Sequence, residues 1–199
     1  MPMQIDFYFD FVSGYSYLAS IALPPLAAER AATISYRPFG LLELMKIVGN
    51  RPTTLESKNK FDYAIVDSQR WAKRYGVPFA LNPSWQGIDF ALLGAGLIVA
   101  GDEGRAADYV KAIYPAVYGE PRDLGQRSEL LDVLGKAGFD GARLLERAQS
   151  APYVERLAKN TTEAAARGVF GSPSMFVDGK MFFGNDRLEF VSEALRAAA

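Results

Sequence analysis

Apolar and polar residues alternate along positions 5–11, near the start of the chain. Isoleucine or phenylalanine takes every second position, and Asp6, Tyr8 and Asp10 fall between them. Successive side chains of a β-strand point to opposite faces of the sheet, so this alternation predicts a strand. Its aromatic residues are expected to pack in the core.

The next two patterns predict a β-α-β unit. After the loop Val12-Ser13-Gly14, helical periodicity runs from about 15 to 32, and Thr33–Pro38 alternates again as a second strand. This is the length of a crossover connection between parallel strands. Pro24 and Pro25 are expected to kink the helix or divide it, because proline lacks a backbone donor and clashes with the preceding turn.

The middle of the chain, 41–167, carries no convincing strand pattern. Its apolar spacing predicts a series of helices, separated by turn signals rich in Gly, Asn and Pro. They cover Leu41–Val48, Thr54–Tyr75, Asp89–Ala100, Arg105–Tyr118, Gly125–Ala137, Asp140–Gln149 and Pro152–Arg167. A segment of this length is too long to be a loop in a compact domain.

The end of the chain returns to strands. Ser174–Asp178 and Lys180–Phe183 flank an Asp-Gly turn, the signature of a hairpin. A final helix is predicted from about 187 to 197, with Asp186 at its N-cap and Glu189 at capping-box spacing.

These elements predict an α/β fold with a large inserted all-helical domain. Residues 1–40 and 168–199 form a split domain that contains the sheet, and residues 41–167 form the inserted helical domain.

The amino-acid composition limits the catalytic groups and metal ligands that the protein can have. Among the 199 residues there is no cysteine and no histidine, and the net charge is −1. Disulfides, cysteine nucleophiles, histidine bases and most transition-metal sites are therefore excluded, and no metal site is predicted. No overall charge favours nucleic acid. A basic N-terminal signal is missing, and the apolar stretch 91–100 is too short to span a bilayer. We expect a soluble cytoplasmic protein without a membrane partner.

Ser13 lies between the first strand and the first helix. A serine at this position commonly caps the helix, because its oxygen accepts a backbone N–H two or three residues later. The same helix end also presents free N–H groups and a partial positive charge, which stabilise an anion such as a thiolate. Since the chain has no thiol, such a thiolate must come from a cofactor.

The chain resembles the 2-hydroxychromene-2-carboxylate isomerase family, which is related to the kappa-class glutathione transferases within the DsbA-like thioredoxin superfamily. That superfamily usually has Cys-x-x-Cys where this chain has Ser13-x-x-Ser16. Further similar motifs extend the resemblance over essentially the whole chain. The motifs are FYFDFVSGYSYLA (7–19), GNRP (49–52), DSQRWA (67–72), YGVP (75–78), GVFGSPSMFVDG (168–179) and FGNDRL (183–188).

The resemblance implies a thioredoxin-like fold split by the helical insertion, with glutathione as cofactor. It implies that Ser13 holds the glutathione sulfur and is the catalytic residue. Ser172 and Pro173 correspond to the family's cis-proline loop, whose backbone pairs with the cysteinyl part of the tripeptide. An ordinary trans proline at the strand entry is the alternative for Pro173.

The resemblance also assigns the two ends of the ligand site. Gly184, Asn185 and Asp186 correspond to the element that binds the γ-glutamyl end, although Asp186 alone has a structural use as a helix cap. Phe183 either packs against the cofactor backbone or belongs to the core.

Lys46, Asn50 and Trp85 match positions that line the substrate pocket in the family. A lysine supplies the cation that a carboxylated substrate requires, and a tryptophan stacks on an aromatic ring or fills the core. One residue departs from the family, which usually has proline after the site serine, where this chain has Gly14. Glycine is more flexible at a first helical turn than proline.

The predicted function is glutathione-dependent cis-trans isomerisation of an aromatic 2-hydroxy or 2-oxo acid in aromatic-compound degradation, and the family implies a homodimer. A kappa-like glutathione transferase or peroxidase is one alternative, and a non-catalytic binding module is another. A disulfide oxidoreductase is excluded because the chain has no cysteine.

Overall fold

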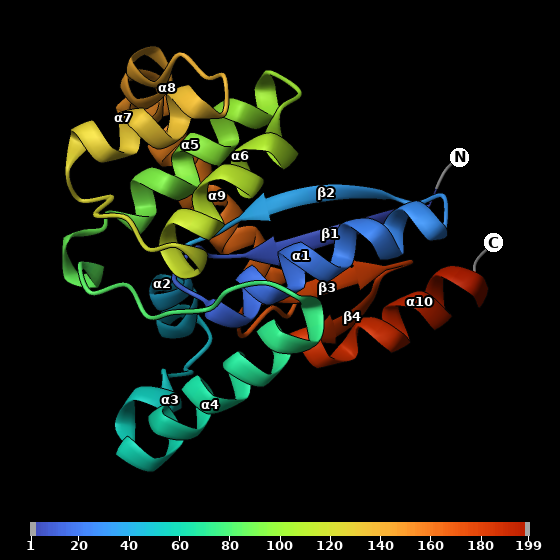
Figure 1. The fold of residues 1–199 in the computed structure, drawn as a ribbon. Helices are drawn as coiled ribbons and strands as arrows, with labels where there is room; N and C mark the ends of the chain where they lie inside the picture. The colour runs from blue at the N-terminus through green and yellow to red at the C-terminus, as the bar shows by residue number, and fades with distance from the viewer. Residues whose placement is uncertain (1–2, 198–199) are drawn as a thin grey trace.

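A computed structural model describes residues 3–197, except for the side chain of Leu55. Its strands are β1 (Gln4–Phe9), β2 (Thr33–Pro38), β3 (Ser174–Val177) and β4 (Lys180–Phe183). Its helices are α1 (Gly14–Glu29), α2 (Leu41–Ile47), α3 (Thr53–Glu56), α4 (Lys58–Tyr75), α5 (Phe90–Asp102), α6 (Ala106–Tyr114), α7 (Arg127–Lys136), α8 (Gly141–Gln149), α9 (Ala151–Ala166) and α10 (Leu188–Ala197). Shorter helical turns are η1 (Trp85–Gly87), η2 (Pro115–Gly119) and η3 (Asn185–Arg187). Strands lie at both ends of the chain and helices between them, as the sequence predicts (Figure 1).

The strands form one sheet in the order β2-β1-β3-β4. β1 is parallel to β2 and antiparallel to β3, and β3 and β4 form the predicted hairpin. Because β1 and β2 are parallel, Phe9 and Pro38 end them at the same edge. Because β3 runs the other way, Ser174 begins it opposite Tyr8. This topology brings the loop after β1 beside the residues that precede β3.

Both faces of β1 are buried. Ile5, Phe7 and Phe9 face the larger core cluster, which includes residues of α1. Tyr8 faces the opposite way, into a smaller cluster with Phe176 and residues of α9. The predicted burial of the aromatic residues is confirmed, and Tyr8, which alternation placed on the polar face, is buried as well.

Helix α1 runs unbroken through both of its prolines, so the predicted division into two helices does not occur. Leu18, Leu23 and Ala27 are buried along it, before and after the prolines. Burial of this continuous apolar face outweighs the backbone hydrogen bonds that proline removes.

The described part of the helical segment 41–167 contains no strand, as predicted. The single helix expected over Thr54–Tyr75 is instead divided into α3 and α4, because Ser57 adopts an extended conformation. Helix α9 packs with Tyr8 and Phe176 against the face of the sheet opposite α1. None of the described helices has the length and hydrophobicity needed to cross a membrane.

The start of the last helix differs from prediction. Asp186 lies inside the turn η3 rather than at an N-cap, and its carboxylate accepts a hydrogen bond from Arg187. The capping-box interpretation of Asp186 is therefore wrong. The carboxylate is partly exposed and remains accessible to a ligand.

We expect Phe9→Ala to destabilise the protein by about 3–5 kcal/mol, because it leaves a cavity beside rings packed at 4.6 to 6.3 Å. Urea unfolding measures the loss. Phe190→Ala is the matched control, because Phe190 is 52% exposed and its truncation should cost less than about 1 kcal/mol. Equal losses for both variants would contradict the assignment of Phe9 to the core.

Candidate functional site

Ser13 caps helix α1, as predicted. Its backbone is extended, and its Oγ accepts a hydrogen bond from the Ser16 N–H at 3.2 Å. The same hydroxyl donates to the carbonyl oxygen of Ser172 at 3.0 Å. The N–H groups of Gly14 and Tyr15, in the first turn, have no acceptor within the helix. Ser13 therefore joins a helix N-terminus to the loop before β3.

The peptide bond between Ser172 and Pro173 is cis, as the resemblance implied. The Ser172 hydroxyl lies 2.7 Å from the hydroxyl of Ser16 and accepts a hydrogen bond from the Asp10 N–H. The Pro173 carbonyl accepts the N–H of Gly184 at 3.0 Å. A continuous network thus connects the start of α1, the cis-proline loop and the turn after β4.

Asp10 is buried and is joined to this network by the hydrogen bond from its N–H to the Ser172 hydroxyl. Its carboxylate accepts hydrogen bonds from the N–H of Val12 at 3.0 Å and from the N–H of Leu41, the first residue of α2, at 2.7 Å. Burial raises the pKa of Asp10 from 3.8 to about 6, although these two backbone donors act in the opposite direction. Its backbone carbonyl accepts the N–H of Ser13.

Two tyrosines tie the helical segment to the same loop. The hydroxyl of Tyr114 donates to the Asp10 carbonyl at 3.1 Å, and that of Tyr118 donates to the Val12 carbonyl. Burial raises the pKa of both phenols well above the ordinary value, so they act as neutral donors.

Phe183 and Gly184 lie beside the cis-proline loop. The Phe183 ring is 42% exposed, which contradicts a core role, and it packs against Phe170 with ring centroids 4.6 Å apart. Gly184 has a φ of +104°, and a Cβ there would collide with the Asp186 carboxylate. Glycine is therefore required at this turn.

Asn185 and Asp186 line a cleft of about 400 Å³ between α1, α4 and α10. The Asn185 amide is buried, and its Nδ2 has no hydrogen-bond partner among the described residues. Arg74 and Tyr75 of α4 line the same cleft. One cation, three carboxylates that include Glu29 and Glu189, and a buried amide donor thus line one cavity, which suits a ligand end that carries an ammonium together with a carboxylate.

Of the predicted substrate residues on the helical segment, Asn50 is bonded near the cis-proline loop, whereas Lys46 is paired with Glu43. Asn50 donates from Nδ2 to the carbonyl of Phe170 at 2.9 Å, near the cis-proline loop. The Lys46 side chain is 73% exposed and pairs with Glu43 at 2.9 Å. Lys46 is therefore free to turn toward a ligand, because an exposed ion pair contributes little stability.

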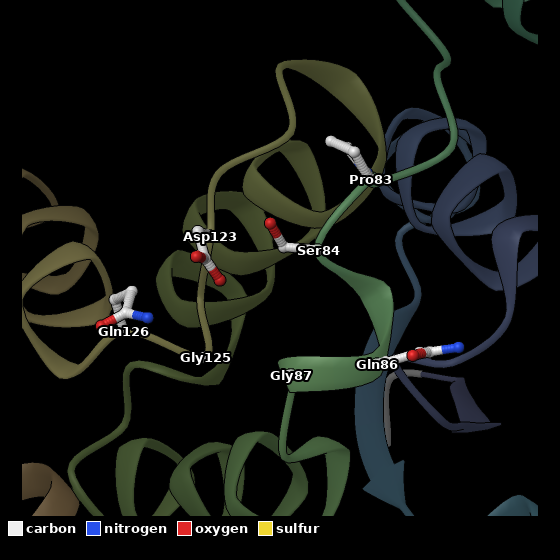
Figure 2. Close-up of a pocket in the computed structure, with 7 residues that line it drawn as sticks. All are labelled: Pro83, Ser84, Gln86, Gly87, Asp123, Gly125 and Gln126. Carbon is white, nitrogen blue, oxygen red and sulfur yellow. The ribbon is translucent and has the colours of Figure 1, made fainter.

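Trp85 is half-buried, 5.7 Å from the ring of Tyr118. The residues on either side of it, Ser84 and Gln86, line a second cleft of about 270 Å³. Figure 2 shows Ser84 and Asp123 between the two chain segments that border this cleft, with Gln86 directed away from them. None of the site residues predicted from the sequence lines it.

The geometry supports anion binding rather than acid-base or metal chemistry. The described residues contain no cluster of three His, Cys, Asp or Glu side chains able to hold a metal ion. Around Ser13 the polar groups are hydroxyls and backbone N–H groups at a helix N-terminus, which stabilise negative charge.

Sequence reasoning missed Asp10, Tyr114 and Tyr118 as parts of this region, and it also missed Phe79, whose ring lies against Gly14. Asp10 has a local signal, because aspartate often accepts the N–H two residues later in a turn. The tyrosines and Phe79 have none, since they reach the loop only through tertiary packing.

Known proteins resemble this chain over nearly its whole length. Residues 4–196 match the family model described as DSBA-like thioredoxin domain. A 2-hydroxychromene-2-carboxylate isomerase from Sphingobium xenophagum is 37% identical over 98% of this chain and 99% of its own length. The solved structure of a 2-hydroxychromene-2-carboxylate isomerase covers 98% of this chain and 96% of its own, with 36% identity and a TM-score of 0.90. Glutathione S-transferase kappa 1 from Caenorhabditis elegans is 25% identical over 97% of this chain and 91% of its own length. The thioredoxin-like fold is thereby confirmed.

We expect the stability of the wild type relative to Asp10→Asn to fall as the pH rises. Burial places the folded pKa of Asp10 at about 6, above its ordinary value of 3.8, so the folded state holds more protons between these values. The wild type should lose about 2 kcal/mol relative to the variant between pH 4 and pH 7. Urea unfolding of both proteins across this range measures the difference, and a constant difference would contradict the raised pKa.

Proposed function

This chain belongs to the DSBA-like thioredoxin family and to its 2-hydroxychromene-2-carboxylate isomerases, and we propose that it is a glutathione-dependent cis-trans isomerase. Its substrate in this proposal is an aromatic 2-hydroxy or 2-oxo acid from the degradation of aromatic compounds. The observation that carries the proposal is the Ser13 hydroxyl at the N-terminus of α1, bonded to the cis-proline loop in a chain without cysteine.

The residues present fit a tripeptide thiol. Ser13 and the first turn of α1 would hold the sulfur, and the backbone of Ser172 and Pro173 would pair with the cysteinyl unit. The buried amide of Asn185, which has no protein acceptor among the described residues, and the carboxylate of Asp186 would hold the γ-glutamyl end. The exposed ring of Phe183 would cover the cofactor backbone between them.

When bound, glutathione would supply a thiol nucleophile that adds reversibly to the conjugated double bond and is released unchanged. The helix N-terminus favours the thiolate over the thiol, which lowers the thiol pKa. A hydroxyl has one proton, and that of Ser13 goes to the Ser172 carbonyl. Donation to a sulfur therefore requires the Ser13 hydroxyl to turn away from this carbonyl.

Lys46, Asn50 and Trp85 would contact the aromatic substrate. Lys46 is exposed on α2 and would pair with the substrate carboxylate. Asn50 is fixed by the Phe170 carbonyl, which places its amide beside the cis-proline loop. Trp85 packs on Tyr118, whose hydroxyl bonds the residue before Ser13, so an aromatic surface lies close to the proposed sulfur position.

A kappa-like glutathione transferase is the second candidate, favoured by the 25% identity with glutathione S-transferase kappa 1. The two reactions use the same cofactor site and differ in the fate of the thiol. A transferase leaves the thiol on its product, and an isomerase releases it.

We also propose a cytoplasmic homodimer. The cytosol maintains a reduced glutathione pool. The exposed apolar side chains Leu42, Ile47 and Val66 on α2 and α4 are consistent with a subunit interface.

We expect Ser13→Ala to lower isomerase turnover about 100-fold, by analogy with loss of one hydrogen-bond donor to a developing anion. The thiolate fraction of bound glutathione, measured by ultraviolet absorbance, should fall in parallel. Ser128→Ala on α7, an exposed serine, is the matched control and should retain full activity. Undiminished turnover of Ser13→Ala would rule out the assigned role.

Product analysis distinguishes the candidate functions. For an isomerase we expect the concentration of free glutathione to stay constant while the aromatic acid is converted. Stoichiometric loss of glutathione would instead identify a transferase, and its conversion to the disulfide would identify a peroxidase. A protein whose melting temperature does not respond to glutathione would be a binding module of another kind.

A further inference from the structure

Gly14 is in close contact with an aromatic ring. It is the first residue of α1, directly after Ser13, and a Cβ built on it would lie 3.1 Å from two ring atoms of Phe79 and 3.3 Å from Tyr118. These separations are shorter than ordinary van der Waals contact. A Cβ at position 14 would therefore require the ring of Phe79 to move by a few tenths of an ångström.

Phe79 is held firmly in this position. It lies in the segment that connects α4 to η1, which crosses in front of the start of α1 in Figure 1. The residue before it accepts a hydrogen bond on its carbonyl from the Tyr17 hydroxyl, at 3.0 Å. The N–H of Ala80, the residue after it, donates to the Tyr118 carbonyl at 2.7 Å. These two hydrogen bonds fix the main chain on both sides of Phe79, and so the position from which its ring extends toward Gly14.

The Phe79 ring belongs to a cluster of three mutually close aromatic rings, since it also lies 6.4 Å from the ring of Tyr17. It lies parallel to Tyr118, with centroids 5.5 Å apart and an angle of 15°, and Tyr118 is parallel to Tyr17 in turn. Trp85 meets Tyr118 at an angle of 61°. Tyr17 and Tyr118 are buried, whereas Phe79 is only partly buried. Phe79 is thus the ring that lies against Gly14, next to Ser13, without being fully buried.

We propose that Phe79 is a specificity-determining residue, whose ring forms an aromatic wall beside Ser13 against which the ring of the substrate packs. The inference rests on the proposed function, because a reacting carbon must come within about 3.5 Å of a sulfur held at Ser13. A bicyclic aromatic acid with one atom there is large enough to reach the ring that lies against the next residue of α1. That residue is Gly14, and Phe79 is the ring that covers it.

Binding of 2-naphthoate to the glutathione-loaded protein tests this role. We expect Phe79→Ala to raise the dissociation constant of 2-naphthoate about 10-fold, and Phe79→Leu to raise it less, because leucine keeps apolar area but loses the flat face. The dissociation constant of glutathione should change less than twofold. Phe61→Ala on α4, a partly exposed phenylalanine, is the control and should alter neither constant.

Unchanged naphthoate binding in both Phe79 variants would overturn the proposal, and so would an equal loss of glutathione binding, which would indicate a general structural role. Failure of the proposed function has a different signature. It would appear as a wild type that binds naphthoate but shows no glutathione-dependent isomerisation.

A thermal double-mutant cycle tests the contact itself. Gly14→Ala should lower the melting temperature by about 3 °C in the wild type, because the new methyl group would lie 3.1 Å from the ring of Phe79 and would push it out of its packed position. In the Phe79→Ala background the same change should raise the melting temperature, since alanine favours helix more than glycine does. An equal rise in both backgrounds would show that Phe79 does not restrict position 14, and would contradict the proposal.

Discussion

The hydrogen bonds of Asp10 hold together the parts of the structure on which the candidate site depends. Its N–H bonds the Ser172 hydroxyl, its carbonyl accepts the N–H of Ser13, and its carboxylate accepts the first N–H of α2. One residue at the end of β1 therefore positions the start of α1, the start of α2 and the cis-proline loop. Ionisation of this buried carboxyl is unfavourable, yet only the ionised form accepts from both of its backbone donors with full strength.

This junction explains how a chain with so few reactive groups can still serve as an enzyme. Hydroxyls and backbone dipoles around Ser13 can stabilise an anion, but none of them is a strong nucleophile at neutral pH. The fold places a helix N-terminus, a cis-proline loop and several aromatic rings together, and these are the groups to which the proposed function assigns a thiol cofactor. Phe79 and Trp85 lie in the segment between α4 and α5, and both rings pack against Tyr118, whose carbonyl binds the N–H of Ala80 in that segment.

Much of this arrangement can be predicted from the sequence, and the exceptions have physical causes. The alternation around Phe7 and the turn at Asp178-Gly179 are local signals, so the strands were predictable. The division of α1 predicted at Pro24 does not occur, because tertiary burial of Leu23 and Ala27 outweighs the tendency of proline to end a helix. The predicted N-cap role of Asp186 was wrong for a different reason, because Asp186 lies in the turn η3 and α10 begins only at Leu188. The contact between Gly14 and Phe79 joins residues 65 positions apart, and no local pattern encodes it.

The two tryptophans of the chain lie in different parts of the site. Trp71 lines the cleft that contains Asn185 and Asp186, and Trp85 packs on the aromatic stack beside Ser13. Each part therefore contains its own intrinsic fluorophore. Proteins that retain only one of the two tryptophans would report separately on the cleft of Asn185 and Asp186 and on the aromatic rings beside Ser13, so a ligand added to the protein can be assigned to one region or the other without any added label.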